Sequence, residues 1–292
     1  MSTATVAIRP RRQVEVGGLD IHGVEAGTSN GRDFLLLHGW PEDSSIFWPL
    51  LDLLGSRTRA VAIDLPGIGA SKIPPKCGEK RGLAHWVSNV IRALGLRDVT
   101  LVGHDVGGQI AYACLRISPV VVGRVALMNI VIPGIDPWDK VIHNPHLWHF
   151  AFHGVAGLPA TLVADHVGEY FAFFFDRLAG PNGVSALERE RYAAAYADRT
   201  ALQTGFDWYR AFSRDAEENR RDFGKPVHTP VLCLRGDKET GAVAEYVEGL
   251  RRAGCGRVDG VIIADCGHFS PSEQPALVAA ELQRFATVLG GR

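Results

Sequence analysis

The stretch Thr100-Leu101-Val102-Gly103-His104-Asp105-Val106-Gly107-Gly108-Gln109 decides the fold. Its apolar run predicts a strand that passes through a tight turn into a helix, and the turn carries an acid among small residues. This is the pattern of a nucleophile elbow with aspartate where serine is usual. The three glycines provide the space that such a strained turn needs. The other interpretation is that Asp105 only caps the helix beginning near Val106.

The composition is typical of a globular chain with a large core. Its 292 residues exceed a typical domain, so we expect one large domain with an insertion, or two domains. Lys and Arg number 31 against 32 Asp and Glu, and this balance offers no basic excess to nucleic acid or anionic lipid. We therefore expect a small-molecule substrate, with neither nucleic acid nor membrane as a partner.

Cysteine usage indicates reduced thiols and a cytoplasmic location. The five cysteines are odd in number and lack Cys-x-x-Cys spacing, which disfavours a disulfide framework and a zinc site. We see neither a signal peptide nor an apolar run long enough to span a bilayer. His146, His149 and His153 would share one helical face, but no carboxylate or thiolate lies close in sequence. We predict no metal and no cofactor.

Strand and helix patterns alternate along both ends of the chain. An N-terminal hairpin is expected from residues 14–16 and 21–25, and buried strands from residues 34–37 and 60–63. Further strands are expected from residues 99–102, 125–128, 231–234 and 260–263. Helices are expected after Ser44 or Ser45, which would cap the first, and at about residues 83–94 and 275–289. The short spacings imply right-handed crossovers and a mostly parallel sheet covered on both faces.

Aromatic residues crowd the middle of the chain with helical spacing and no strand pattern. We predict a helical cap over residues 134–224, inserted into a core formed by residues 1–133 and 225–292. Aromatic side chains cover apolar ligand surface, so we expect a bulky, largely apolar substrate beneath the cap. The same surface could serve a homodimer or only the pocket.

Four motifs, in this order, resemble the α/β-hydrolase superfamily across nearly the whole chain. They are His38-Gly39-Trp40-Pro41, Asp64-Leu65-Pro66-Gly67-Ile68-Gly69-Ala70-Ser71, the Asp105 elbow, and Asp265-Cys266-Gly267-His268 before Glu273-Gln274-Pro275. The resemblance implies the α/β-hydrolase fold, an α/β architecture, with Asp105 as nucleophile and His268 as general base. The backbone N–H groups of Val106 and Trp40 would form the oxyanion hole. His38 would be structural, and the Trp40–Pro41 peptide cis, as in epoxide hydrolases.

Aspartate at the elbow changes the chemistry expected of the site. A carboxylate is a weak acyl-transfer nucleophile, but it can displace a leaving group at an sp3 carbon and form an alkyl ester. The substrate is then an epoxide or an alkyl halide. His268 would activate the water that attacks the ester carbonyl.

The predicted insertion resembles one bacterial subgroup of epoxide hydrolases. The similar stretches are Leu-Trp-His-Phe-Ala-Phe-His-Gly at 147–154 and Phe-Asp-Trp-Tyr-Arg-Ala-Phe at 206–212. That subgroup uses a histidine and a tyrosine to hold the epoxide oxygen as the ring opens. The resemblance implies His149 and Tyr209 as this pair, with four aromatic residues at the substrate: Trp148, Phe150, Phe152 and Trp208. The other interpretation of Tyr209 is an aromatic residue of the core or lid.

Two other functions stay open. Haloalkane dehalogenases typically have tryptophan directly after the nucleophile, and fluoroacetate dehalogenases have arginines one and four residues after it. Here those positions hold Val106 and Gln109, so a small anionic substrate has no obvious clamp. The second alternative is a non-hydrolytic protein of this fold, because Asn129 stands where the similar subgroup has an acid.

The acid that orients His268 has three candidates. In Arg235-Gly236-Asp237-Lys238-Glu239 the spacing favours Glu239 over Asp237. Asn129 is the alternative, and it can orient an imidazole but cannot stabilise an imidazolium by charge. The sequence thus predicts an epoxide hydrolase that forms a vicinal diol through a hydroxyalkyl ester on Asp105, with water as co-substrate.

Overall fold

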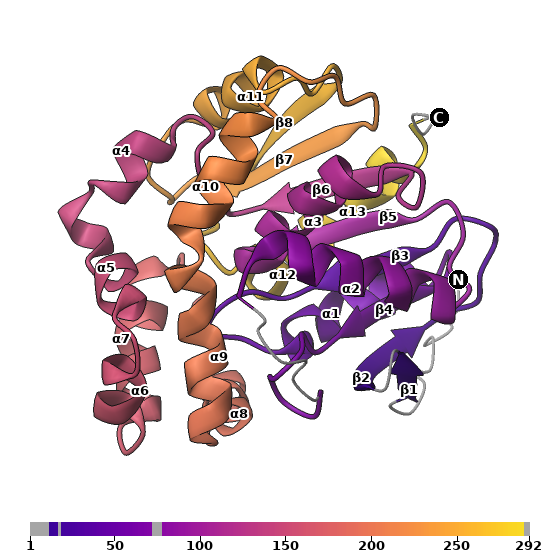
Figure 1. The fold of residues 1–292 in the computed structure, drawn as a ribbon. Coiled ribbons are helices and arrows are strands. Elements are labelled where there is room, and N and C mark those ends of the chain that lie inside the picture. Colours follow the sequence, from indigo (N-terminus) through magenta and orange to yellow (C-terminus); the bar gives the residue numbers. More distant parts are fainter. Residues whose placement is uncertain (1–11, 17–18, 72–77, 289–292) are drawn as a thin grey trace.

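The strands come from both ends of the chain in the computed structural model, which describes residues 12–16, 19–71 and 78–288. They are β1 (Arg12–Val16), β2 (Leu19–Ala26), β3 (Phe34–Leu37), β4 (Ala60–Ile63), β5 (Thr100–His104), β6 (Arg124–Met128), β7 (Val231–Gly236) and β8 (Val258–Ile263). In the described residues they form one eight-stranded sheet in the order β1-β2-β4-β3-β5-β6-β7-β8 (Figure 1). The predicted α/β-hydrolase fold is confirmed.

The strand directions follow the sequence pattern. The predicted hairpin is confirmed, since β1 pairs antiparallel with β2, although residues 17 and 18 of its turn lie outside the described residues. Strand β2 is antiparallel to β4, and all the pairings from β4 through β8 are parallel. Every residue of β3, β4, β5 and β6 is buried. Continuous apolar runs are expected where helices cover both faces of a parallel sheet.

Two pairs of helices cover the faces of the sheet. Helices α2 (Lys80–Ala93) and α3 (Val106–Ile117) pack together on one face, and α1 (Trp48–Gly55) and α13 (Pro275–Ala286) pack together on the other (Figure 1). Helix α11 (Val243–Arg252) packs on β7 and β8. Along the sheet, β4 lies on one side of β3 and β5 lies on the other, so the connections β3–α1–β4 and β4–α2–β5 run in opposite directions. Because both crossovers are right-handed, α1 and α2 lie on opposite faces of the sheet. The reversal opens a crevice at the carboxyl ends of β3 and β5.

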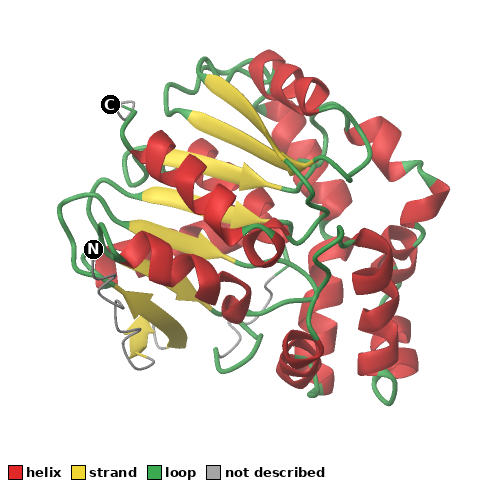
Figure 2. Cartoon of the chain, turned by 180° about the vertical axis from the view of Figure 1, so that it is seen from behind, coloured by secondary structure: helices red, strands yellow, loops and turns green. Residues whose placement is uncertain are grey.

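Between β6 and β7 the described chain has helices and no strand. These are α4 (Trp138–Ile142), the 3₁₀ helix η2 (Pro145–Leu147), α5 (His149–Gly154), α6 (Leu158–Val163), α7 (Val167–Leu178), α8 (Ala186–Ala195), α9 (Arg199–Arg210) and α10 (Phe212–Arg221). Figure 2 shows them together beyond the arrowheads of the parallel strands. We call residues 134–224 the cap segment. Among the described helices, none has the length and apolar character that a bilayer crossing requires.

Two predicted helix starts were wrong. Asp43, rather than Ser44 or Ser45, is the cap after β3, since its carboxylate accepts the Ser45 N–H at 2.8 Å. The 3₁₀ helix η1 (Ser44–Phe47) then precedes α1. Helix α2 begins at Lys80, three residues before the predicted start, because the Lys80 N–H is satisfied by Asp215 Oδ1 at 3.0 Å. That partner comes from the cap segment, so no local pattern could reveal it.

Candidate active site

Asp105 occupies the turn between β5 and α3 with φ 49° and ψ −125°. Positive φ is uncommon for a residue with a side chain and marks a strained turn. A Cβ on Gly103 would lie 2.2 Å from the Gly107 carbonyl oxygen, so only glycine allows the following helix to pass this close. Although Asp105 stands at the N-cap position of α3, its side chain makes no capping hydrogen bond. The carboxylate is turned toward the loop after β3 instead.

Trp40, on the loop after β3, supplies the polar contact with that carboxylate. Its backbone N–H donates to Asp105 Oδ1 at 3.0 Å. A Cβ on Gly39 would lie 2.3 Å from Asp105 Cβ, so the loop passes directly over the acid. The Trp40–Pro41 peptide is cis, as predicted. Val106 is the first residue of α3, and its N–H belongs to the donors that a helix leaves without an internal partner.

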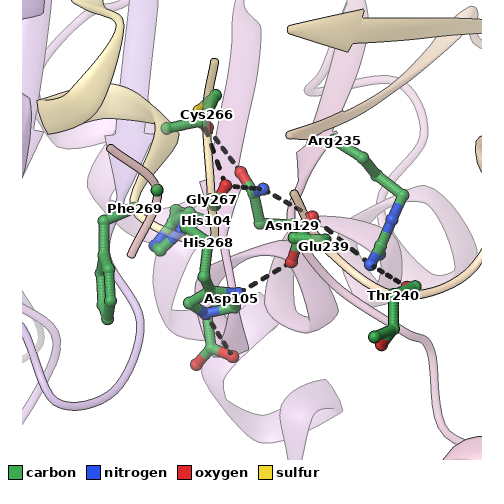
Figure 3. Close-up of polar contacts among 12 residues, drawn as sticks. His104, Asp105, Asn129, Arg235, Glu239, Thr240, Cys266, Gly267, His268 and Phe269 are labelled. Carbon is green, nitrogen blue, oxygen red and sulfur yellow. Dashed lines mark hydrogen bonds and ion pairs between the residues drawn. The ribbon is translucent and has the colours of Figure 1, made fainter. Parts of the chain in front are cut away.

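His268 lies on the loop between β8 and α12 (Ser270–Glu273), facing Asp105 (Figure 3). Its Nε2 is 3.7 Å from Asp105 Oδ2, which is too long for a direct hydrogen bond. Its Nδ1 is 3.0 Å from Glu239 Oε1. Since a carboxylate only accepts hydrogen bonds, Nδ1 carries a proton, and Nε2 is the ring nitrogen on the side of Asp105.

Glu239 is held on both oxygens. Asn129 Nδ2 donates to Oε2 at 2.8 Å, and Arg235 Nη2 lies 3.3 Å from the same oxygen (Figure 3). Burial by itself would raise the pKa of Glu239, but the hydrogen bond from His268 and the charge of Arg235 lower it on balance. Asp237 instead accepts the Cys266 N–H at 3.0 Å. Of the three predicted orienting residues, Glu239 contacts His268 directly and Asn129 acts on it through Glu239.

Both backbone polar groups of His268 have hydrogen-bonding partners. Its N–H donates to the Leu178 carbonyl at 2.8 Å, and its carbonyl lies 2.7 Å from His104 Nε2. The other nitrogen of His104 lies 2.9 Å from Glu42 Oε2, so both ring nitrogens face acceptors. Burial by itself would lower the pKa of His104, but the charge of Glu42 and its hydrogen bond raise it to about 9. His104 is therefore a buried imidazolium beneath the nucleophile.

His149 and Tyr209, the predicted ring-opening pair, come from α5 and α9 and have ring centroids 5.8 Å apart. The His149 ring stacks on Trp40 and meets Phe150 and Phe174 edge-on. Burial, with a smaller contribution from His268, lowers the pKa of His149 to about 3, so its imidazole is neutral. Burial raises the pKa of Tyr209 well above its usual value, so its hydroxyl keeps the proton.

One cavity joins these groups. Its volume is about 220 Å³, below the roughly 300–1,000 Å³ of pockets that hold drug-sized ligands. The expectation of a bulky, largely apolar substrate stays a prediction. The predicted site residues on its wall are Trp40, Asp105, Asn129, His149, Phe150, Tyr209, Glu239 and His268.

Three residues predicted at the substrate do not line this cavity: Trp148, Phe152 and Trp208. Trp148 is 43 % exposed and packs on Phe152 and Phe173. Trp208 is fully buried, because adjacent positions of α9 point about 100° apart and Tyr209 takes the direction of the cavity. Contact of these three residues with substrate stays a prediction.

Comparison with known proteins identifies the family. A sequence model described as the alpha/beta hydrolase fold matches residues 34–275. This chain belongs to the α/β-hydrolase fold family. The match spans the elbow, the cap segment and His268.

Two relatives of this α/β-hydrolase are named for hydrolysis of an epoxide and for removal of a halogen. A soluble epoxide hydrolase of Corynebacterium sp. (strain C12) is 27% identical over 282 residues, covering 94% of this chain and 96% of that protein. A fluoroacetate dehalogenase of Burkholderia sp. is 27% identical over 237 residues, covering 77% of each. The crystal structure of Cfl2 wild-type from Burkholderia cenocepacia superposes with a TM-score of 0.86 at 31% identity, covering 97% of each chain.

Several polar residues of this α/β-hydrolase site were missed from the sequence. Arg177, Arg235 and Lys238 line the cavity, and His104 and Glu42 lie beneath it. Arg235 and His104 interrupt otherwise apolar, buried strands, and a buried polar side chain needs a partner. That signal was present in the sequence, although it does not identify the partner.

Proposed function

We propose that this α/β-hydrolase opens an epoxide to a vicinal diol through an ester on Asp105. One observation carries the proposal: a single cavity presents Asp105 and the His268–Glu239 pair on one wall and His149 with Tyr209 on another. These are a nucleophile, a base with its orienting acid, and two proton-bearing groups that can receive an epoxide oxygen.

In the first step, Asp105 Oδ2 attacks a ring carbon and the bond from that carbon to the epoxide oxygen breaks. The Trp40 N–H holds the other carboxylate oxygen, which leaves Oδ2 facing His268 and the cavity. Tyr209 gives its proton to the departing oxygen, and His149, as a neutral imidazole, donates a hydrogen bond to it. The products of this step are a hydroxyalkyl ester and a tyrosinate.

In the second step, His268 Nε2 removes a proton from water while the water oxygen attacks Cγ of the ester. The negative charge that develops falls on Oδ1, which already accepts the Trp40 N–H, and the Val106 N–H is the second donor. Glu239 stabilises the imidazolium that forms. Collapse expels the diol oxygen, which takes a proton from His268. The carboxyl proton left on Asp105 passes to solvent, and solvent returns the proton of Tyr209.

The cap segment would serve as a cap domain in this mechanism, because it supplies both ring-opening residues to a core that supplies the nucleophile and the base. The aromatic wall around His149 and the volume of about 220 Å³ favour a compact, largely apolar epoxide.

A single turnover in oxygen-18 water tests the covalent route. Enzyme in excess over epoxide should release unlabelled diol, because the added oxygen comes from Asp105, and the label should appear in the peptide that contains Asp105. Label in the diol from that first turnover would overturn the assignment of the nucleophile.

Dehalogenation is the second candidate, favoured by the similarity to the fluoroacetate dehalogenase. Asp105 would displace halide by the same attack, and His149 and Tyr209 would hydrogen-bond the leaving halide. A panel of epoxides, bromoalkanes and haloacetates separates the two reactions, since halide release without diol formation would favour dehalogenation.

A non-hydrolytic function is tested with His268→Gln. An epoxide hydrolase lacking this base should accumulate an alkyl-enzyme that is heavier by the mass of the epoxide. A binding protein should form no adduct with any epoxide or halide, in either the variant or the parent.

A further inference from the structure

Glu273 has no part in the mechanism above, although it lies five residues after His268 and is buried. Its side chain accepts three backbone N–H groups. Oε1 accepts from Phe269 at 2.9 Å, and Oε2 accepts from Gly267 at 3.0 Å and from Gly180 at 2.6 Å. The carboxyl group thus binds the backbone immediately before and immediately after His268.

The third donor, Gly180, belongs to the cap segment rather than to the core. It lies two residues beyond the end of α7, and the Leu178 carbonyl accepts the N–H of His268 itself. A Cβ on Gly180 would lie 2.5 Å from the Gly267 nitrogen, and one on Gly267 would lie 2.3 Å from the Gly180 nitrogen. The two backbones are therefore in direct contact, and Glu273 bridges them at the point of contact.

We propose that Glu273 is a positioning residue that uses the end of α7 to hold His268 in place for ester hydrolysis. This inference rests on the proposed function. The grip acts on the peptide that carries His268, whereas Asp105 is held separately by β5, α3 and the Trp40 N–H. Weakening the contact between the end of α7 and the His268 loop should therefore slow hydrolysis of the ester and leave the rate of Asp105 alkylation unchanged.

The test replaces Glu273 by Gln and measures the two half-reactions separately. The amide keeps one acceptor oxygen, but its NH₂ group would face backbone N–H donors, which removes one side of the grip. We expect alkylation of Asp105 within about three-fold of the parent and ester hydrolysis slowed roughly 10- to 100-fold, since a shift of about 1 Å in a reacting group has effects of this size. Alkyl-enzyme should then accumulate, which intact mass spectrometry detects. The control is Glu281→Gln, on α13, where the described partner of the acid is Arg284.

A second variant approaches the junction from the cap side. In Gly180→Ala the new methyl group would lie 2.5 Å from the Gly267 nitrogen and 2.6 Å from Glu273 Oε2, so the two backbones must separate. We expect the same slow hydrolysis with alkylation preserved. Gly168→Ala is its matched control on α7, because a Cβ at Gly168 meets nothing within 4 Å.

Alkylation also reports on folding, since a misfolded chain cannot assemble the elbow. The inference is overturned if alkylation and hydrolysis fall together, as they would if Glu273 only stabilised the fold. It is also overturned if neither rate changes in either variant. The proposed function itself fails in a different way, when the parent enzyme forms no adduct and turns over no epoxide.

Discussion

In the proposed mechanism, the hydroxyl of Tyr209 is the acid of the first half-reaction. Because burial raises its pKa, Tyr209 holds its proton at neutral pH until the developing alkoxide takes it. Tyr209→Phe should slow alkylation of Asp105 by roughly 10²–10³-fold, the usual effect of removing one donor to a developing oxyanion. The rate is measured by mass spectrometry in a single turnover. Tyr170→Phe is the control, since that hydroxyl bonds His153 and does not line the cavity. Equal effects of the two changes would contradict the assignment.

In the proposed mechanism, Glu239 acts in the second half-reaction. Glu239→Gln keeps a polar group beside His268 Nδ1 but removes the charge that stabilises the imidazolium. We expect ester hydrolysis to slow by roughly 10²–10⁴-fold, as when the acid of a catalytic triad is replaced by its amide. Asp237→Asn should leave hydrolysis within about two-fold, because Asp237 bonds the Cys266 N–H and Lys238 instead. The assignment is wrong if Asp237→Asn has the larger effect in rapid-quench assays.

Motif spacing in the sequence identifies some residues of the site, whereas others depend on how the helices of the cap segment pack. Asp105, Trp40 and His268 follow strand ends at motif spacing, and the parallel sheet brings such positions to one edge. Phe152 and Trp208 lie in helices rich in aromatic residues, and Trp148 lies in the turn between η2 and α5. Which helix face meets the cavity depends on how the helices pack, and the sequence pattern does not contain that information.

At the scale of elements, a buried ion pair joins α2 to α10. Lys80 Nζ lies 2.9 Å from Asp215 Oδ2, with both side chains almost fully buried. Burial lowers the pKa of Lys80 and the charge of Asp215 opposes that shift. Asp215→Asn should lower the free energy of unfolding by about 3–5 kcal/mol, because it leaves a buried charge without its partner. Urea unfolding measures this value. The double variant Lys80→Met/Asp215→Leu should lose much less free energy of unfolding than Asp215→Asn. An equal loss in both variants would show that the unpaired charge is not the cause.

This pair also explains why some element boundaries escaped prediction. The buried strands were predicted within one or two residues at nearly every end, since burial on both faces demands a continuous apolar run. The start of α2 depends on Asp215, which lies 135 residues away in the chain. A local pattern identifies an element by the face that it buries, whereas its ends depend on whichever groups satisfy the exposed backbone donors.

For the whole molecule, His104 and His149 predict opposite effects of pH on stability. The pKa of His104 is raised to about 9, so its contribution is complete below the unfolded value of about 6.5 and is lost as the pH rises through 9. The pKa of His149 is lowered to about 3, so the unfolded chain binds the extra proton below about 6.5 and stability falls as the pH falls. Each slope is at most about 1.4 kcal/mol per pH unit.

Urea unfolding between pH 4 and 9 measures these slopes. His104→Gln should reduce the slope of the free energy of unfolding against pH on the alkaline side. His149→Phe should reduce that slope on the acidic side. Unchanged slopes in both variants would show that other groups control the pH dependence.

The bond between the Leu178 carbonyl and the His268 N–H joins the cap segment to the loop that carries His268. The segment leaves after β6 and returns into β7, two neighbouring parallel strands, which is the geometry of an exchangeable insert. A chimera that received a foreign insert would nevertheless lose the contact of Gly180 with Gly267 and Glu273. A chimera that keeps this contact must therefore exchange the end of α7 together with the loop of residues 265–273.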